Sequence, residues 1–304
     1  MKIIALPNAL GAEVVGLDLT REIPEADFQM LYQAYLDHLL LLVRGQKIGD
    51  DDLLRLASRF GELMLPPAAH ERSGHQVSDA PPAITVVSNV KVNGLPIGEL
   101  GDGEVVWHSD YSFKEVVGGM RVLHGVKIPP AEAGGTTWFA NMYAAFDTLP
   151  PDLRQVALQR AIRHDTAYDT NRNLRMGAKP GESSGPVHPI VNTHSETGAN
   201  SLFLGRRLAH AIDGLPAGES DRLLDAMWQH ATQDRFTYEH HWRQGDVVLW
   251  DNRCTLHRRG PFDARQERIL HAAQVKGDRP LRAPDAHSRP PHPRARAVVE
   301  AQPA

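Results

Sequence analysis

The sequence predicts a mainly β fold, a β-sandwich or jelly roll with helices at its periphery. Short runs of strand-forming residues recur along the chain and are separated by turns rich in glycine and proline. Amphipathic helical stripes are few, so helices are expected outside the sheets. Residues typical of one metal site also fall in two distant segments, and the mouth of a sandwich is where inward-facing residues of several strands meet.

The first sixty residues predict a strand or hairpin, two helices and a core strand between them. Residues 10–19 alternate apolar side chains with glycine, as a strand or hairpin does. Apolar residues repeat at spacings of three and four over 28–40, which predicts a helix with one buried stripe. Residues 39–43 are expected to form a core strand. Asp50 then begins a second amphipathic helix that Gly61 ends.

A long loop is expected between the second helix and the next strand, at 84–90. Residues 66–82 are rich in Pro, Gly, His and Ser and show no periodicity. A loop of this length inside a compact domain is more often functional or mobile than accidental. His70 and His75 lie in it, and His70 is a candidate substrate contact.

The rest of the chain is expected to alternate strands and helices around one exposed insertion. Strands are predicted at 120–126, 134–139, 187–191, 201–204, 245–250 and 268–275. Helices are predicted at 153–162 and 223–231. Residues 166–186, rich in Asn, Arg, Gly and Ser, predict the insertion.

No repeat and no linker divides the chain, so residues 1–278 are expected to form a single domain. From residue 279 onward the sequence consists largely of Pro, Arg, His and Ala without periodicity. Such a segment buries too little apolar surface to order itself, so residues 279–304 are predicted to be a disordered tail.

Bulk composition excludes several classes of partner. The chain of 304 residues has a net charge of −4 and a sequence pI of about 6.5, so neither nucleic acid nor an anionic membrane is expected as a partner. Its one cysteine, Cys254, allows no internal disulfide and is compatible with a reducing cytoplasm. No apolar run approaches the roughly 20 residues of a membrane span, and the first residues lack a secretory leader's apolar core. A cytoplasmic protein is expected.

The strongest functional signal is a histidine and an aspartate two positions apart in the strand-forming run 105–113. Side chains at i and i+2 leave the same face of a strand, so His108 and Asp110 can close on one metal ion. His257, far along the chain, offers a third ligand. Two neutral imidazoles and one carboxylate, with other positions open, describe a non-heme Fe(II) site that activates oxygen.

The pair alone is a weak signal, because a second match, His194-Ser-Glu196, occurs in the same chain. That match lies in a polar, glycine-containing cluster that predicts a turn between strands, so we discount it. Two alternatives remain open from these residues. Two histidines and a carboxylate also hold catalytic zinc, as in a hydrolase, and a catalytically silent binding protein could share the fold.

Further stretches extend the match well beyond the pair. They are residues 107–110, 134–137, 245–253, 257 and 268–271. In these stretches the chain resembles the taurine dioxygenase / 2,4-dichlorophenoxyacetate dioxygenase family of Fe(II)- and 2-oxoglutarate-dependent oxygenases. The resemblance implies a double-stranded β-helix, a jelly roll, and an enzyme that oxidises a small organic substrate with O2 while 2-oxoglutarate becomes succinate and CO2. It also implies a homo-oligomer.

The resemblance also assigns the site. It implies that His108, Asp110 and His257 hold iron and that no catalytic residue is needed beyond these ligands. It implies that Arg268 pairs with the far carboxylate of 2-oxoglutarate, which a guanidinium can grip with two parallel hydrogen bonds. Thr137 is implied to hydrogen-bond the same carboxylate, although the adjacent Thr136 is an alternative. Because halogenating relatives lack the carboxylate ligand, Asp110 favours hydroxylation or a cleavage that hydroxylation triggers.

Two departures argue against taurine as the substrate. Where the taurine enzymes carry a second arginine, four residues after the cosubstrate arginine, this chain has Ala272, which should face the same cavity. Where they carry a histidine, this chain has Pro66. The substrate is therefore open, with Tyr111, beside the metal ligands, as a further candidate contact. A charge for the substrate could come from another direction, from Arg121, Arg206, Arg207 or Lys91.

Overall fold

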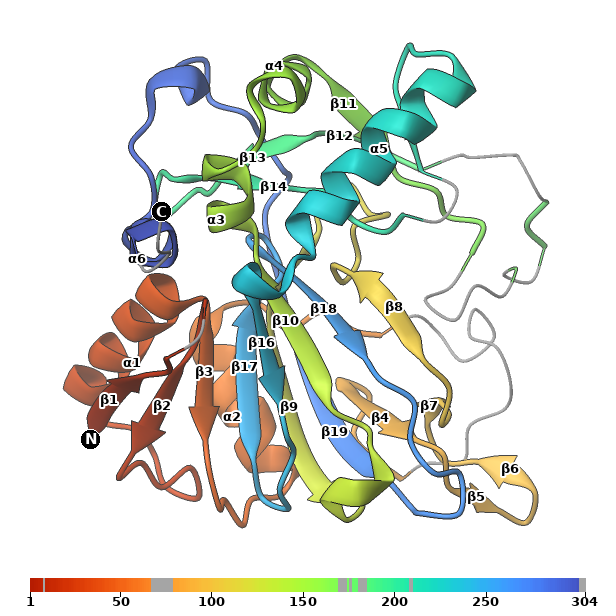
Figure 1. Cartoon of the computed structure of the whole chain (residues 1–304). Helices are drawn as coiled ribbons and strands as arrows, with labels where there is room; N and C mark the ends of the chain where they lie inside the picture. Colours follow the sequence, from red (N-terminus) through yellow and green to blue (C-terminus); the bar gives the residue numbers. More distant parts are fainter. Residues whose placement is uncertain are drawn as a thin grey trace.

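Two β-sheets face each other, and together they form the jelly roll of a double-stranded β-helix (Figure 1). The computed structural model describes residues 1–7, 9–66, 79–168, 174, 177–179, 185–207 and 210–300, apart from the side chains of 299 and 300. The major sheet runs, in spatial order, β1 (Lys2–Ala5), β2 (Ala12–Val15), β3 (Leu40–Val43), β17 (Val247–Asp251), β9 (Gly118–Lys127), β19 (Ile269–Lys276), β4 (Ile84–Ser88) and β7 (Glu99–Leu100). The minor sheet runs β16 (Thr237–His240), β10 (Thr137–Asn141), β18 (Thr255–Arg259) and β8 (Val105–His108).

The central strands of the major sheet are buried on both faces, which explains their nearly continuous apolar sequence. In β3 all four residues are buried: Leu40 and Leu42 face the minor sheet, while Leu41 and Val43 face the helices. Helices α1 (Glu25–His38) and α2 (Asp50–Phe60) cover that outer face, as the sequence predicts. Leu39, with φ of 65°, takes a left-handed conformation that ends α1 and turns the chain into β3.

The second half of the chain adds a cap over one end of the two sheets (Figure 1). Its helices are α3 (Met142–Asp147), α4 (Pro151–Gln159) and α5 (Ala217–Ala231). Its short strands are β11 (Ala161–Arg163), β12 (Val187–Pro189), β13 (Val191–Thr193), β14 (Asn200–Leu202) and β15 (Ala211–Ile212). A separate hairpin, β5 (Lys91–Val92) and β6 (Leu95–Pro96), projects beside β4. Helices form at both predicted places, 153–162 and 223–231, and both start earlier than predicted. The first also ends earlier, at Gln159, because Ala161 and Ile162 belong to β11.

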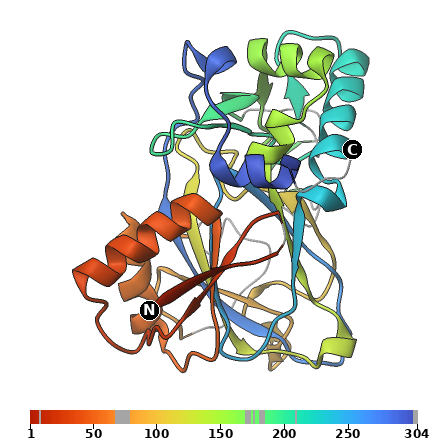
Figure 2. The same cartoon turned by 60° about the vertical axis from the view of Figure 1, so that its left-hand side comes forward.

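The tail differs from its prediction. Residues 293–300 form helix α6 (Pro293–Glu300), which packs against α1 and α3 (Figure 2). Ala295 is fully buried and Val298 nearly so, both within the main core. The imidazole of His292 stacks on the ring of Tyr143, with centroids 4.3 Å apart. The prediction of disorder from 279 onward was wrong for this segment, because a few well-placed contacts order a sequence whose composition is unfavourable.

The predicted long loop and the predicted insertion fall mostly outside the described residues. His70 and His75 both lie there, as do most of residues 166–186. Among the helices that the structure does describe, none is long and apolar enough to span a bilayer.

Candidate metal centre

The minor sheet brings the two distant histidines together. His108 is the last residue of β8 and His257 lies in the middle of β18, and the two residues pair directly across these antiparallel strands. Their ring centroids are 4.1 Å apart. Asp110 follows β8 by two residues. One ligand atom from each of the three side chains lies within 4.8 Å of the others, so the convergence that the sequence predicts is present.

The imidazole of His108 is held in one orientation. Its Nδ1 atom lies 2.8 Å from the carbonyl oxygen of Val106, so the ring donates its hydrogen there. Its Nε2 atom is then left as a lone-pair donor, 3.5 Å from Oδ1 of Asp110. A second partner that fixes the tautomer in this way is typical of histidines that bind metal.

The carboxylate of Asp110 is ionised and lies where it can bind a cation. Its Oδ2 atom lies 3.8 Å from Nε2 of His257 and 3.4 Å from Nε of Arg121. Although burial raises the pKa of this carboxyl, Arg121 and the two histidines lower it below the ordinary value. The same Oδ2 atom is buried and accepts no hydrogen bond from the described residues. An ionised oxygen without a hydrogen bond, beside two imidazoles, fits a divalent metal.

His257 is prepared to be a neutral ligand. Its ring is buried between the rings of Phe139 and Trp250, at centroid distances of 6.1 and 4.8 Å. Burial, followed by the nearby His108, lowers its pKa well below the ordinary value, so the imidazole stays unprotonated. Two neutral imidazoles and one carboxylate on one side of a site fit Fe(II) with open positions for other ligands.

The turn between β17 and β18 anchors the centre. Oδ1 of Asn252 accepts hydrogen bonds from the backbone N–H of Asp110, at 3.3 Å, and from Nε1 of Trp250, at 3.0 Å. Nδ2 of Asn252 donates to the carbonyl oxygen of Gly119 at 3.0 Å, and the Ser109 hydroxyl donates to the Asn252 carbonyl oxygen at 2.7 Å. The turn thus ties both ligand strands to β9.

A second cluster of possible ligands lies behind this turn but is already satisfied. His194, Asp251 and Cys254 are buried, with ligand atoms within 4.8 Å of one another. Arg253 grips both oxygens of Asp251, at 2.9 and 2.7 Å, and Nε2 of His194 donates to Oδ2 at 3.0 Å. The Nδ1 atom of His194 accepts two backbone N–H groups, from Glu196 and Thr197. These residues form a structural network, which agrees with discounting the His194-Ser-Glu196 match.

Arg268 and Thr137 share Trp242 as a neighbour. Arg268 is 2% exposed, and its Nη2 atom donates to the carbonyl oxygen of Gly135 at 3.3 Å. A Cβ on Gly135 would lie 3.3 Å from Nε of Arg268, so glycine makes room for this side chain. Burial, and then the positive charge of Arg259, lowers the pKa of Arg268 to about 9. The guanidinium therefore remains charged at neutral pH.

The Thr137 hydroxyl accepts one hydrogen bond and can donate another. Nε1 of Trp242 donates to Oγ1 of Thr137 at 2.9 Å, so the hydroxyl hydrogen of Thr137 can point elsewhere. The ring of Trp242 lies 6.0 Å from the Arg268 guanidinium. A charged donor and a hydroxyl donor near one another suit a carboxylate.

The four basic residues considered as partners for a charged substrate lie in different environments. Arg121 is paired with Asp110, at 3.4 Å. Arg207 pairs with Asp221 and Asp225 at the surface, and Lys91 is exposed on β5. Arg206 is 3% exposed, and its backbone forms an isolated β-bridge with that of His108. Its guanidinium donates to the carbonyl oxygen of Asp165 at 3.5 Å and lies 5.6 Å from the ring of Phe113.

The structure describes some of the other residues that the sequence analysis connects with the substrate. Tyr111 directly follows Asp110 with φ of 55°, and its ring lies 6.0 Å from that of Phe113. Ala272 is buried in the core between the sheets, on the face predicted for it. His271 points the other way, with Nδ1 2.6 Å from Oδ1 of Asp50.

The sequence did not identify three residues that shape the centre. Arg121 as the partner of Asp110, Arg259 as the neighbour of Arg268, and Trp242 as the partner of Thr137 all emerge from the structure. A signal for the first was available, because a charged residue inside the otherwise apolar run 117–123 is rarely buried unless it is paired.

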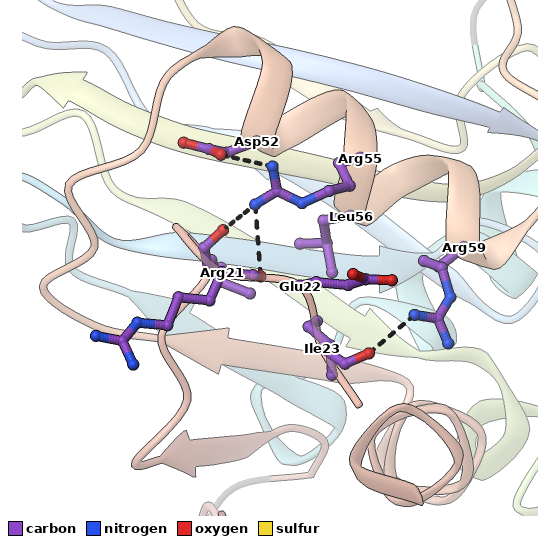
Figure 3. A pocket seen from close by; sticks show the side chains of 8 residues that line it. Arg21, Glu22, Ile23, Asp52, Arg55, Leu56 and Arg59 are labelled. Carbon is purple, nitrogen blue, oxygen red and sulfur yellow. Dashed lines mark hydrogen bonds and ion pairs between the residues drawn. The ribbon is translucent and has the colours of Figure 1, made fainter. Parts of the chain in front are cut away.

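A surface pocket beside α2 shares no residue with this centre. It is lined by Leu19, Arg21, Glu22, Ile23, Asp52, Arg55, Leu56 and Arg59 (Figure 3). Two of its arginines form hydrogen bonds with the backbone. Arg55 donates to the carbonyl oxygen of Leu19 at 2.8 Å, and Arg59 donates to that of Ile23 at 3.0 Å. The pocket therefore belongs to the packing of α2.

Comparisons with known proteins agree with this geometry. The family model for taurine catabolism dioxygenase TauD, TfdA family, matches residues 2–274. The chain is 34% identical over 286 residues to the (S)-phenoxypropionate/alpha-ketoglutarate-dioxygenase of Delftia acidovorans, covering 88% of this chain and 92% of that protein. It is 35% identical over 272 residues to the alpha-ketoglutarate-dependent 2,4-dichlorophenoxyacetate dioxygenase of a Burkholderia species, covering 82% and 85%. The crystal structure of AAD-2 in complex with Mn(II) and N-oxalylglycine has a TM-score of 0.74 at 26% identity, covering 92% of this chain and 98% of that one.

Proposed function

Because the chain belongs to the TauD/TfdA family of Fe(II)- and 2-oxoglutarate-dependent dioxygenases, we propose that it hydroxylates a C–H bond of a small organic substrate. The enzyme is an oxidoreductase of that class, which uses O2 and converts 2-oxoglutarate into succinate and CO2. When bound, Fe(II) supplies the activation of O2. The observation that carries the proposal is the convergence of His108, Asp110 and His257 in one buried cluster.

In this proposal each side chain has one task. His108, Asp110 and His257 hold the metal on one side and leave its other positions open. Arg268 binds the distal carboxylate of 2-oxoglutarate, and Thr137 donates its hydroxyl hydrogen to the same group. The burial of Arg268 supports its role, since a desolvated guanidinium gains more from an incoming carboxylate than an exposed one does.

The substrate class proposed is a small aryloxyalkanoate or a similar organic anion. Two relatives are named for phenoxypropionate and 2,4-dichlorophenoxyacetate, which are carboxylates of this kind. Arg206 is proposed as a source of positive charge for such an anion, because it is buried and its backbone pairs with that of His108. Tyr111 is proposed to line the same cavity, and His70 stays a prediction outside the described residues. Ala272 and Pro66 make taurine an unfavourable candidate.

One experiment tests the class against both alternatives. Purified protein is incubated with Fe(II), 2-oxoglutarate and a panel of aryloxyalkanoates, sulfonates, sulfate esters and amino acids, and succinate release and O2 uptake are measured. We expect iron-dependent succinate release that a chelator abolishes and that an aryloxyalkanoate stimulates. Hydrolysis of an ester with added zinc and no succinate would support the zinc hydrolase instead. Binding of ligands without any turnover would support the silent binding protein.

We also propose a cytoplasmic homo-oligomer. The chain's one cysteine, Cys254, is a free thiol, which is compatible with a reducing compartment. The edge strand β1, with Ile4 52% exposed beside Val15 on β2, supports association through this edge. Mass measurement by light scattering on the eluting protein tests the oligomer, and a monomer at micromolar concentration would contradict it.

A further inference from the structure

Arg259 is a second buried arginine close to the cosubstrate pocket. It lies two residues after His257 on β18 and pairs directly across from Thr137 on β10. Residues two apart on a strand share a face, and Phe139 likewise pairs with His257, so the side chain of Arg259 emerges on the same face as Thr137 and the metal ligand. Only 6% of Arg259 is exposed.

One end of the Arg259 guanidinium is bonded and the other is not. Its Nη2 atom donates to the carbonyl oxygen of Leu100, at 2.9 Å, and to that of Gly103. Its Nε and Nη1 atoms are buried and have no hydrogen-bond partner among the described residues. Leu100 has φ of 72°, an unfavourable conformation for leucine, and the bond from Arg259 helps to hold it. Arg259 thus stabilises the segment before β8, and its Nε and Nη1 groups remain available to donate hydrogen bonds to a ligand.

Arg259 and Arg268 share the ring of Phe262. Their guanidinium carbons lie 5.4 and 5.6 Å from its centroid. Burial lowers the pKa of Arg259 to about 10, which leaves the group charged at neutral pH. No carboxylate in the described part of the chain lies within ion-pair distance of either guanidinium. The carboxylate of Asp102 offsets the charge of Arg259 only in part, from beyond ion-pair distance. The pocket therefore holds two neighbouring positive charges that no ion pair neutralises, an arrangement that is costly until an anion arrives.

We propose that Arg259 is a positioning residue that makes the cosubstrate pocket selective for 2-oxo acids with a distal carboxylate. This inference rests on the proposed role of Arg268. A ligand with a distal carboxylate compensates both charges at once, while one that ends in a methyl group leaves them facing each other. Selectivity then comes as much from the penalty on the wrong ligand as from contacts with the right one.

The test compares two ligands of equal chain length. Mn(II)-loaded protein is titrated calorimetrically with 2-oxoglutarate and with 2-oxovalerate, which has a methyl group in place of the distal carboxylate, and the ratio of the two affinities is the readout. For Arg259→Gln we expect this ratio to fall about tenfold or more, because one of two charges is lost. Arg259→Lys, which keeps the charge, should retain most of the ratio.

Arg258→Gln is the matched control. Arg258 is the neighbouring residue on β18, points to the other face and lies 3.7 Å from Glu104, so its loss should leave the ratio unchanged. An equal loss of affinity for both ligands in Arg259→Gln, or an unchanged ratio, would overturn the inference. Arg268→Gln is measured in the same series. If Arg268→Gln collapses the ratio and Arg259→Gln does not, only this inference fails, whereas an unchanged ratio in Arg268→Gln defeats the proposed role of Arg268 itself.

Discussion

His257 and His271 lie on consecutive strands of the chain, one in each sheet, and have different tasks. His257 faces Asp110 and His108, whereas His271 faces away from them and binds Asp50. We predict that His257→Ala lowers affinity for Fe(II) by more than about 100-fold, since a lost ligand should cost more than a lost supporting contact. His271→Ala should keep the iron and lose about 1 kcal/mol of stability with its hydrogen bond. Anaerobic iron titration of both variants is the measurement, and equal iron binding would refute the assignment of His257.

The absence of a side chain at Gly135 leaves room for Arg268. Gly135 has φ of 82°, and its added Cβ would lie 3.3 Å from both Nε of Arg268 and Cβ of Phe262. We predict that Gly135→Ala costs about 1–2 kcal/mol through the left-handed backbone and also raises the KM for 2-oxoglutarate by displacing Arg268. Gly214, with φ of 77° and no atom within 4 Å of its Cβ position, offers the matched control. Gly214→Ala should show a similar loss of stability with an unchanged KM. A KM that stays constant in both variants would contradict the prediction.

Among the structural elements, the β17–β18 turn is the one on which the centre depends most. Removing the amide in Asn252→Ala leaves Trp250 Nε1, the Asp110 N–H and the Gly119 carbonyl without their side-chain partner. We predict a loss of about 3 kcal/mol in stability and a 10- to 100-fold loss of iron affinity.

The control for this variant is another buried asparagine that contacts the same turn. Asn192 donates to the carbonyl oxygen of Arg253 at 3.4 Å and accepts a bond from the N–H of Leu281. Asn192→Ala should cost stability and leave iron affinity unchanged. Stability is followed by urea denaturation and affinity by iron titration. Equal iron affinities in the two variants would show that Asn252 only stabilises the fold.

The sequence predicts some elements well because their signals are local. The stripes of α1 and α2 need only their own periodicity. The i, i+2 spacing brings His108 and Asp110 together as expected, although β8 ends at His108 and Asp110 lies in the turn that follows it. Helix α6 has no such signal, because its order depends on Ala295 and Val298 meeting a core built by residues far away in the chain. Arg259 is hidden for a related reason. The groups that surround it, the carbonyl oxygens of Leu100 and Gly103 and the ring of Phe262, come from other segments of the chain.

For the molecule as a whole, buried histidines link stability to pH. His164, His188 and His210 lie together in the cap, with centroid distances from His164 of 5.0 and 4.6 Å. Burial lowers the pKa of each of them, that of His210 to about 3. The folded pKa values lie below the unfolded value of about 6.5, so the unfolded chain binds more protons below that pH. Stability is therefore full above about pH 6.5 and falls as the pH drops.

We predict a loss of about 1.4 kcal/mol for each unit of pH and each histidine that takes up a proton on unfolding. Urea denaturation at about pH 7 and about pH 5 measures the slope. His210→Gln should make the slope shallower, and His287→Gln, at an exposed position, should not. A stability that is flat across this range would mean that the cap histidines take up no protons when the chain unfolds.

Cys254 gives this molecule a built-in reporter. It is the chain's one thiol, 2% exposed, and lies between Asn252 and His257 in the turn that anchors the metal ligands. Burial raises its pKa, so a thiol reagent can attack it only when that turn opens. The rate of alkylation of Cys254, measured with and without iron, would thus report how often this turn opens, and the measurement needs no engineered label.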